Sequence, residues 1–252
     1  MSRSFEGTRS RNRTDARFPE TTWGVVRRAA SSSPTHAQPA LESLCRAYWE
    51  PVYAFIRHSG KSPHDAEDLT QRFFVHLLAK SRLCGVRPEK GKFRSFLRRS
   101  VKNFLVDDWR RKPAPERKGL IFHFEIDGEE GERRFHHEPT DKLSPEKLFE
   151  RVWTHKVLDQ AVGRLEQEFT RAGKREAFDV LHSFLPGCEP VCSRAEAAQR
   201  LGITVNALDT AFHRMKKRYR ELLRHVISET LDSPTKSEIE EELSALMSVF
   251  SQ

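Results

Sequence analysis

Several features common in enzymes, membrane proteins and exported proteins are missing from this chain of 252 residues. No apolar run is long enough to cross a membrane, and the polar segment from Met1 to Arg17 lacks the apolar core of a signal peptide. There is no glycine-rich phosphate loop and no nucleophile elbow, and the eleven histidines are dispersed. We therefore expect a cytoplasmic protein that is not an enzyme, with no catalytic residue and no cofactor.

Cysteine is also scarce, with only four residues in the chain. Their scatter fits a reduced compartment better than a disulfide framework. Cys188 and Cys192 lie close together with His182 upstream, so zinc ligation is an alternative. However, the spacing is not a standard zinc pattern and a fourth ligand is missing, so we expect ordinary thiols and no metal site.

Period-two alternation is absent too, and this argues against β-strands. Helix starts, in contrast, are well marked by Ser62-Pro63, Ser144-Pro145 and a capping box that joins Ser193 to Glu196. The sequence therefore predicts an all-α fold. In the first half, helices are expected over residues 22–30, 39–58, 63–80 and 92–111, and Pro51 is expected to kink or break the second of them.

The chain is rich in charge, and the sign of that charge changes along its length. The net charge is +8, but nine acids against four bases between His123 and Glu150 give that segment a net charge of −5. We interpret the acidic segment as a linker between two basic helical blocks. The predicted division is a disordered basic tail at 1–20, a helical domain at 21–112, the acidic linker at 113–144, a second helical domain at 145–232 and a C-terminal amphipathic helix at 233–252.

A helix-turn-helix is the clearest local pattern of the second block. After the capping box at Ser193, Gly202 suits a tight turn and Thr204 suits the N-cap of a second helix. The apolar residues expected to be buried are Ala198, Ile203, Leu208 and Ala211. From Arg200 to Arg224 seven bases face two acids. Such a helix would place its first side chains on base edges and its basic end on phosphates; a plain helical hairpin with a solvated basic face is the alternative.

A second basic helix is predicted in the first block, where ten bases face three acids between Lys92 and Lys118. One face carries the apolar residues Phe93, Phe96, Leu97, Val101, Phe104 and Leu105. Arg94, Arg98 and Lys102 share another face, because they are four residues apart. Bases beside an aromatic residue suit single-stranded or melting DNA. A surface helix with an ordinary core stripe is the alternative, and Trp109 is either core or DNA-facing.

Three motifs, in this order, resemble the sigma factors of the extracytoplasmic-function (ECF) group. The segment from Asp65 to Phe74 resembles the helix that binds the polymerase clamp, although on physical grounds alone its acids are only partners of the helix dipole. The segment from Phe93 to Arg111 resembles the minus-ten recognition and melting helix. The segment from Ala197 to Arg218 resembles the minus-thirty-five helix-turn-helix.

This resemblance implies a sigma factor with a sigma two-like and a sigma four-like domain. It would bind core RNA polymerase and promoter DNA and direct promoter recognition and melting at transcription initiation, without catalysing a reaction. An anti-sigma or other regulatory protein is a further candidate partner, and no membrane contact is implied. The contact sets carried over are Asp65, Asp68, Leu69, Gln71 and Phe74 for polymerase; Arg94, Arg98, Arg99, Lys102, Asn103, Trp109, Arg110 and Arg111 for the minus-ten element; and Thr204, Asn206, Ala207, Thr210, His213, Arg214, Lys217 and Arg218 for the minus-thirty-five element.

Stretches around Trp23 and Trp49, and the segment from Arg218 to Leu223, also resemble a sigma subgroup common in planctomycetes. The chain departs from the usual recognition-helix pattern at Asn206 and Asp209, so its promoter sequence is not implied. A regulator that binds duplex DNA without polymerase is the alternative function, although it would not need the first-block motifs. The linker is either a passive tether or a strand that threads the basic RNA channel of polymerase.

Overall fold

The structure is a computed structural model that describes residues 22–30, 34–78, 83, 86–110, 143–185 and 192–249. Every regular element in these ranges is helical, which confirms the all-α prediction. The helices are α1 (Thr22–Ala29), α2 (Pro34–His58), α3 (Pro63–Leu78), the short 3-10 helix η1 (Pro88–Lys90), α4 (Phe93–Arg110), α6 (Pro145–Arg171), α7 (Arg175–His182), α8 (Arg194–Arg200), α9 (Val205–Thr230) and α10 (Lys236–Ser248). No helix in the described ranges is long and apolar enough to cross a membrane.

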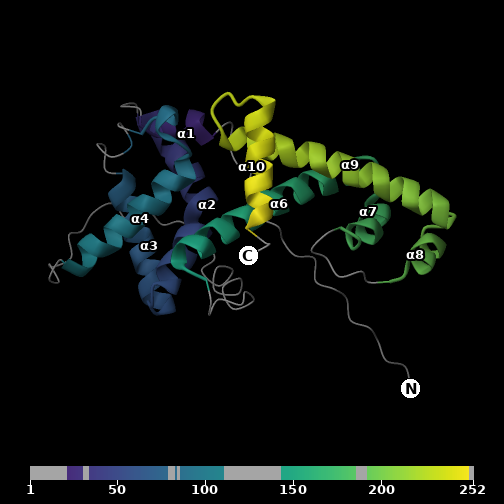
Figure 1. Ribbon diagram of the computed structural model, residues 1–252, viewed down its shortest axis with the longest axis horizontal. Helices are drawn as coiled ribbons and strands as arrows, with labels where there is room; N and C mark the ends of the chain where they lie inside the picture. Colours follow the sequence, from purple (N-terminus) through teal and green to yellow (C-terminus); the bar gives the residue numbers. More distant parts are fainter. Residues whose placement is uncertain are drawn as a thin grey trace, which may run out of the picture.

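Helices α1 to α4 form one block around α2 (Figure 1). Aromatic side chains join them: Trp49 of α2 stacks on Phe74 of α3 with ring centroids 5.9 Å apart. Tyr48 of α2 meets Phe93 of α4 edge-on at 5.4 Å. Edge-on and offset pairs of this kind add to the stabilisation that burial already provides. The first block therefore has its own aromatic core.

Helix α2 excludes one of the two outcomes predicted for Pro51, a break in the helix. The helix starts at Pro34 rather than at residue 39, and it runs through Pro51 to His58 without a break. A proline inside a helix removes one backbone hydrogen bond. Here Tyr48, Val52 and Phe55, on both sides of it, are buried in the core. We infer that this packing holds the backbone helical despite the missing bond.

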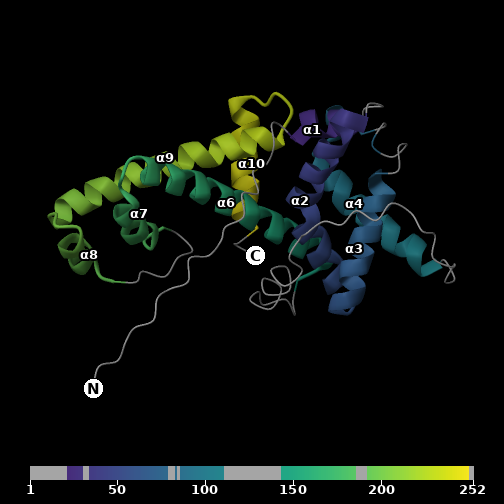
Figure 2. The same ribbon diagram turned by 180° about the vertical axis from the view of Figure 1, so that it is seen from behind.

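The second block is built on two long helices, α6 and α9, which lie side by side and extend away from the first block (Figures 1 and 2). Arg164 of α6 and Glu229 of α9 form two parallel hydrogen bonds of 2.9 and 2.6 Å. The short helices α7 and α8 pack near the far end of α9. This arrangement carries the predicted helix-turn-helix far from α4.

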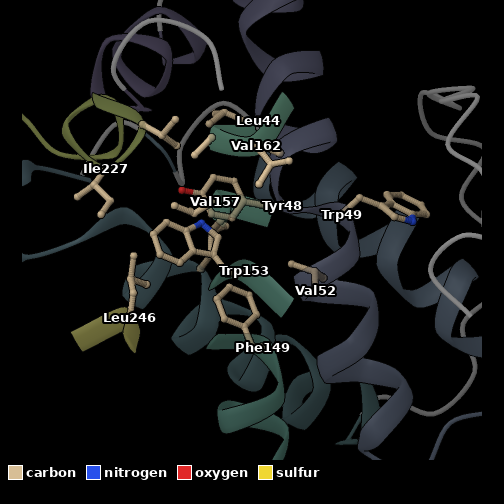
Figure 3. Packing of buried hydrophobic residues seen from close by; sticks show 14 of the residues in the cluster. Leu44, Tyr48, Trp49, Val52, Phe149, Trp153, Val157, Val162, Ile227 and Leu246 are labelled. Atoms are coloured by element: carbon tan, nitrogen blue, oxygen red, sulfur yellow. The ribbon is translucent and has the colours of Figure 1, made fainter. Parts of the chain in front are cut away.

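The two blocks meet where the first half of α6 packs on α2 (Figure 3). The buried residues of this junction are Leu44, Tyr48 and Val52 from α2, Phe149, Trp153 and Val157 from α6, Ile227 from α9 and Leu246 from α10. They belong to one continuous hydrophobic cluster that also reaches into both blocks. The two predicted domains thus share a core in this structure. Residues 113–142 of the predicted acidic linker lie outside the described residues, as does the N-terminal tail.

Helix α10 lies within the predicted C-terminal segment and starts at a capping box formed by Thr235 and Glu238. Its apolar residues differ in exposure. Leu246 is buried and Ile239 and Leu243 are partly buried, but Met247 is exposed. Besides Leu246, the buried residue of α10 is an acid, Glu242.

Candidate nucleic-acid interface

Helices α8 (Arg194–Arg200) and α9 (Val205–Thr230) have the caps and the turn glycine that the sequence predicts. The Ser193 hydroxyl accepts the Glu196 N–H, and the Glu196 carboxylate accepts the Ser193 N–H, which completes the capping box of α8. Gly202 has a φ of +64°, a backbone conformation that favours glycine. The Thr204 hydroxyl accepts the Ala207 N–H at 3.2 Å and caps α9. These local signals therefore fix where both helices begin.

The packing between the two helices agrees with the prediction except at Ile203. Ala198 and Leu208 are buried and Ala211 is partly buried, as expected. Ile203 is 39% exposed, although it was expected in the buried set. It precedes the N-cap Thr204 and therefore lies in the turn, where the helical period that places Leu208 and Ala211 inward has not begun.

The residues predicted to contact the minus-thirty-five element are all exposed. Asn206, Thr210 and Lys217 share one face of α9, because they are spaced by helical turns. The full set is Thr204, Asn206, Ala207, Thr210, His213, Arg214, Lys217 and Arg218. The sequence placed the end of this helix in the basic run, but α9 continues to Thr230. The structure thus gathers the set on one accessible surface, and its contact with DNA stays a prediction.

Among the charged residues on or beside the predicted DNA face of α9, Arg218 and Asp209 are paired within the protein. Arg218 binds both carboxylate oxygens of Glu168 on α6, at 2.9 and 2.7 Å, and also binds Glu221. These hydrogen bonds raise the pKa of Arg218 and lower the pKa of Glu168. Asp209 forms an ion pair with Arg194 of α8. The guanidinium of Arg218 is therefore occupied by carboxylates in this structure. The negative charge of Asp209 is neutralised by Arg194.

The predicted minus-ten face of α4 has a different environment. Its three in-line bases are aligned as the spacing predicts, but each one binds an acid from α6. Arg94 donates to Glu150 at 2.9 Å, and Arg98 donates to the same carboxylate at 2.7 Å. Lys102 lies 2.7 Å from Glu146, and this hydrogen bond lowers the pKa of Glu146. Both acids lie at the C-terminal end of the acidic run from His123 to Glu150, just beyond the predicted linker, in the first turns of α6.

Arg94 corrects the sequence interpretation most clearly, because its residue exposure is only 8%. Besides Glu150 it binds Glu242 of α10, and its guanidinium lies 4.4 Å from the centroid of the Trp153 ring. Burial alone would lower the pKa of Arg94, but the carboxylates of Glu242 and Glu150 outweigh it and raise the pKa. Arg94 is thus an internal ion-pair residue in this structure and not part of an open DNA surface.

Sequence reasoning missed Glu242. Its carboxylate is fully buried and pairs with Lys92 as well as Arg94. The only local signal is that an acid occupies helical spacing with the apolar residues Ile239 and Leu246. Because α10 also carries exposed acids such as Glu240 and Glu241, Glu242 looked like one more solvated charge.

The remaining minus-ten candidates lie toward solvent. Arg99, Asn103 and Arg110 are exposed, and Trp109 is 84% exposed. Trp109 is therefore not a core residue in this structure, and its contact with DNA stays a prediction. Arg111 lies outside the described residues. An exposed tryptophan beside an arginine at the end of α4 is suited to stacking on an unpaired base.

Helix α3 confirms its predicted buried stripe and corrects part of its contact set. Asp65, Asp68 and Gln71 are exposed, as expected of a partner-binding surface. Leu69 and Phe74 are buried in the core, so they hold the helix in place and offer no surface to polymerase. The apolar residues Ala66, Leu69, Phe73 and Leu77 recur at helical spacing, which predicts a buried stripe, and all four are buried.

The cysteines give no sign of a metal centre within the described ranges. Cys45 is buried, and this burial raises the pKa of its thiol. No group of three metal-ligating side chains occurs among the described residues. Cys188, which the alternative zinc site requires, lies outside them.

Comparison with known proteins shows what the first block is similar to. Residues 44–113, which span most of α2 together with α3 and α4, match the family model of Sigma-70 region 2. The chain is also similar to the ECF RNA polymerase sigma factor SigE of Mycolicibacterium smegmatis, with 24% identity over 197 residues. That alignment covers 78% of this chain and spans 66% of the length of SigE. No solved structure matches the chain.

Proposed function

We propose that this chain, which carries a sigma-70 region 2 domain, is a sigma factor of the ECF type that binds core RNA polymerase and directs promoter recognition and DNA melting at transcription initiation. The match over residues 44–113 carries the proposal, because it contains both α3 and α4. The similarity to SigE extends along most of the chain and supports the same function. A sigma factor acts by binding and catalyses no reaction, and this one would act in the cytoplasm.

Each of three helices has an exposed surface that suits a different binding partner. Exposed Asp65, Asp68 and Gln71 on α3 would bind polymerase. The open face of α9 would hold the minus-thirty-five duplex, with Arg214 among its base or phosphate contacts. The end of α4, with Trp109, would stack on a base of the melted strand.

The finer assignments are part of the same proposal. Residues 145–232 would be the sigma four-like domain, supported by the cap, turn and packing geometry of α8 and α9. The segment at 113–144 would be a linker, either passive or threaded through polymerase, and the chain would fall in the planctomycete-like subgroup. An anti-sigma protein is a candidate regulator.

The decisive experiment mixes the purified chain with core RNA polymerase. We expect a stable complex on size-exclusion chromatography and promoter-dependent run-off transcription. Failure of both would overturn the proposal. A footprint on duplex DNA without polymerase, together with no core binding, would favour the alternative regulator.

A charge-reversal variant tests the polymerase surface. Replacing both Asp65 and Asp68 by lysine should weaken core binding and leave the helical circular dichroism spectrum unchanged, because both side chains are exposed. The matched control reverses Glu176 and Asp179, two exposed acids on α7. Equal core binding by the test and control variants would remove α3 from the polymerase interface.

A further inference from the structure

Three carboxylates from other parts of the chain lie on the basic face of α4. Glu146 and Glu150 come from the start of α6, and Glu242 comes from α10. Together they bind four bases, namely Lys92, Arg94, Arg98 and Lys102. Every member of the in-line basic set predicted to hold DNA thus has an acidic partner within the chain.

The contacts at the α10 end are the most buried. The carboxylate of Glu242 is fully enclosed, and Arg94, which it binds, is stacked on Trp153. Charges this deeply enclosed exchange partners only when the elements around them separate. The contacts therefore depend on α10 being seated against α4 and α6.

Helix α10 is fixed by contacts on two further sides. Leu246 is buried in the cluster that contains Trp153 and Ile227 (Figure 3). On the other side, Glu240 binds Arg224 of α9 at 2.5 Å, a solvent-exposed pair that does not involve α4. Glu240 and Glu242 are thus acids on one helix, with only the second directed to the predicted DNA face.

Carboxylates and phosphates compete for the same guanidinium and ammonium donors, because both accept charge-assisted hydrogen bonds from them. We propose that the free chain is autoinhibited: the carboxylates of α6 and α10 occupy the places of DNA phosphates on α4, and both α10 and the start of α6 must withdraw before the whole face binds a melted strand. The inference rests on the proposed function. It leaves the α9 face unaffected, since the exposed residues there are not covered by α10.

The test compares two glutamine variants of the full-length chain in the absence of polymerase. Glu242→Gln removes the buried charge from the α4 face, and Glu240→Gln removes an exposed charge from the same helix. Binding to a labelled thymidine oligonucleotide and to a labelled duplex is measured by fluorescence polarisation. We expect Glu242→Gln to bind the oligonucleotide about 5- to 20-fold more tightly than wild type, a size typical of coupling between two sites, with duplex binding unchanged. Glu240→Gln should match wild type on both.

Equal oligonucleotide affinity of wild type and Glu242→Gln would overturn the proposal. An equal gain in Glu240→Gln would do the same, since it would reflect net charge alone. If circular dichroism shows that Glu242→Gln is unfolded, Glu146→Gln serves in its place, because its pair with Lys102 is partly exposed. A smaller gain in the same direction is then expected, and no gain overturns the proposal.

Core polymerase separates failure of this inference from failure of the proposed function. If wild type and Glu242→Gln bind the oligonucleotide equally but both initiate transcription with core polymerase, the autoinhibition is wrong and the sigma assignment stands. If Glu242→Gln gains oligonucleotide affinity but neither protein binds core polymerase, the masked face is real and the sigma assignment is wrong.

Discussion

The basic helices α4 and α9 carry similar excesses of positive charge but have opposite surroundings. On α4, Arg94, Arg98 and Lys102 are all bound by acids from α6 and α10. On α9, the predicted contact residues His213, Arg214 and Lys217 are exposed. The difference shows that a basic run in a sequence predicts binding of some anion but does not identify which one. Whether that anion is DNA or the protein's own carboxylate depends on tertiary neighbours.

The largest expected effect is a loss of folding stability when the ion pairs of α4 are removed. Arg94→Met should lower the free energy of unfolding by about 3–5 kcal/mol, because it leaves the buried carboxylate of Glu242 with Lys92 as its remaining cation. Arg214→Ala on α9 should change it by no more than about 0.5 kcal/mol. Urea unfolding followed by circular dichroism measures both.

A double variant checks the reason for that loss. Arg94→Met combined with Glu242→Gln removes both charges, so it should recover part of the stability lost by Arg94→Met alone. If the single variant is as stable as wild type, α4 is not held by these acids and the comparison between the two helices fails.

The next largest effect is a loss of duplex binding when an exposed base of α9 is replaced. Arg214→Ala should weaken binding to a promoter duplex by about 1–3 kcal/mol if its guanidinium contacts a base edge. In the same free protein, Lys102→Ala should have little effect, because Lys102 is bound to Glu146. A gel-shift titration at fixed salt measures both affinities, and an equal loss in the two variants would contradict the masked state of α4.

Replacing Trp109 tests whether a residue of α4 affects promoter opening without affecting folding stability. Because its side chain is exposed, Trp109→Ala should leave the unfolding free energy within about 0.5 kcal/mol of wild type. It should nevertheless reduce promoter opening by the complex with polymerase, by about 1–3 kcal/mol if the ring stacks on one base. Permanganate reactivity of unpaired thymines reports this step. Normal opening by Trp109→Ala would exclude the stacking role.

The smallest effect concerns the cap that places the α9 face. Thr204→Ala should lower the unfolding free energy by about 1 kcal/mol, since the Ala207 N–H loses its acceptor. Thr210→Ala, on the exposed side of the same helix, is the matched control and should stay within about 0.5 kcal/mol of wild type. Equal thermal stability of the two variants would show that the cap does not determine the start of α9.

Local chemistry explains what was predictable from the sequence. Ser193 and Thr204 mark helix starts through hydrogen bonds that span only three residues, and both caps are present in the structure. The apolar period on α3 likewise gave its buried stripe. These features need no knowledge of distant residues, so a sequence pattern is enough to place them.

Long-range contacts explain what was missed. Arg94 was grouped with Arg98 by spacing, but its partner Glu242 lies 148 positions further along the chain. Pro51 was expected to interrupt α2, because the packing of the residues around it cannot be derived from the proline itself. Leu69 and Phe74 were predicted as polymerase contacts from their positions in the motif, although both side chains are buried in the core.

The buried ion pairs of Arg94 also link the evolution of distant parts of the chain. Glu150 and Glu242, which hold this arginine, lie on two helices far from it in sequence. A lineage that lost α10 would leave Arg94 with one carboxylate fewer, and selection should then favour a smaller or apolar residue at position 94. A lineage that keeps both Lys92 and Arg94 should keep an acid at position 242. Positions 92, 94 and 242 are therefore expected to covary, so that the history of the C-terminal helix is recorded in the sequence of the first block.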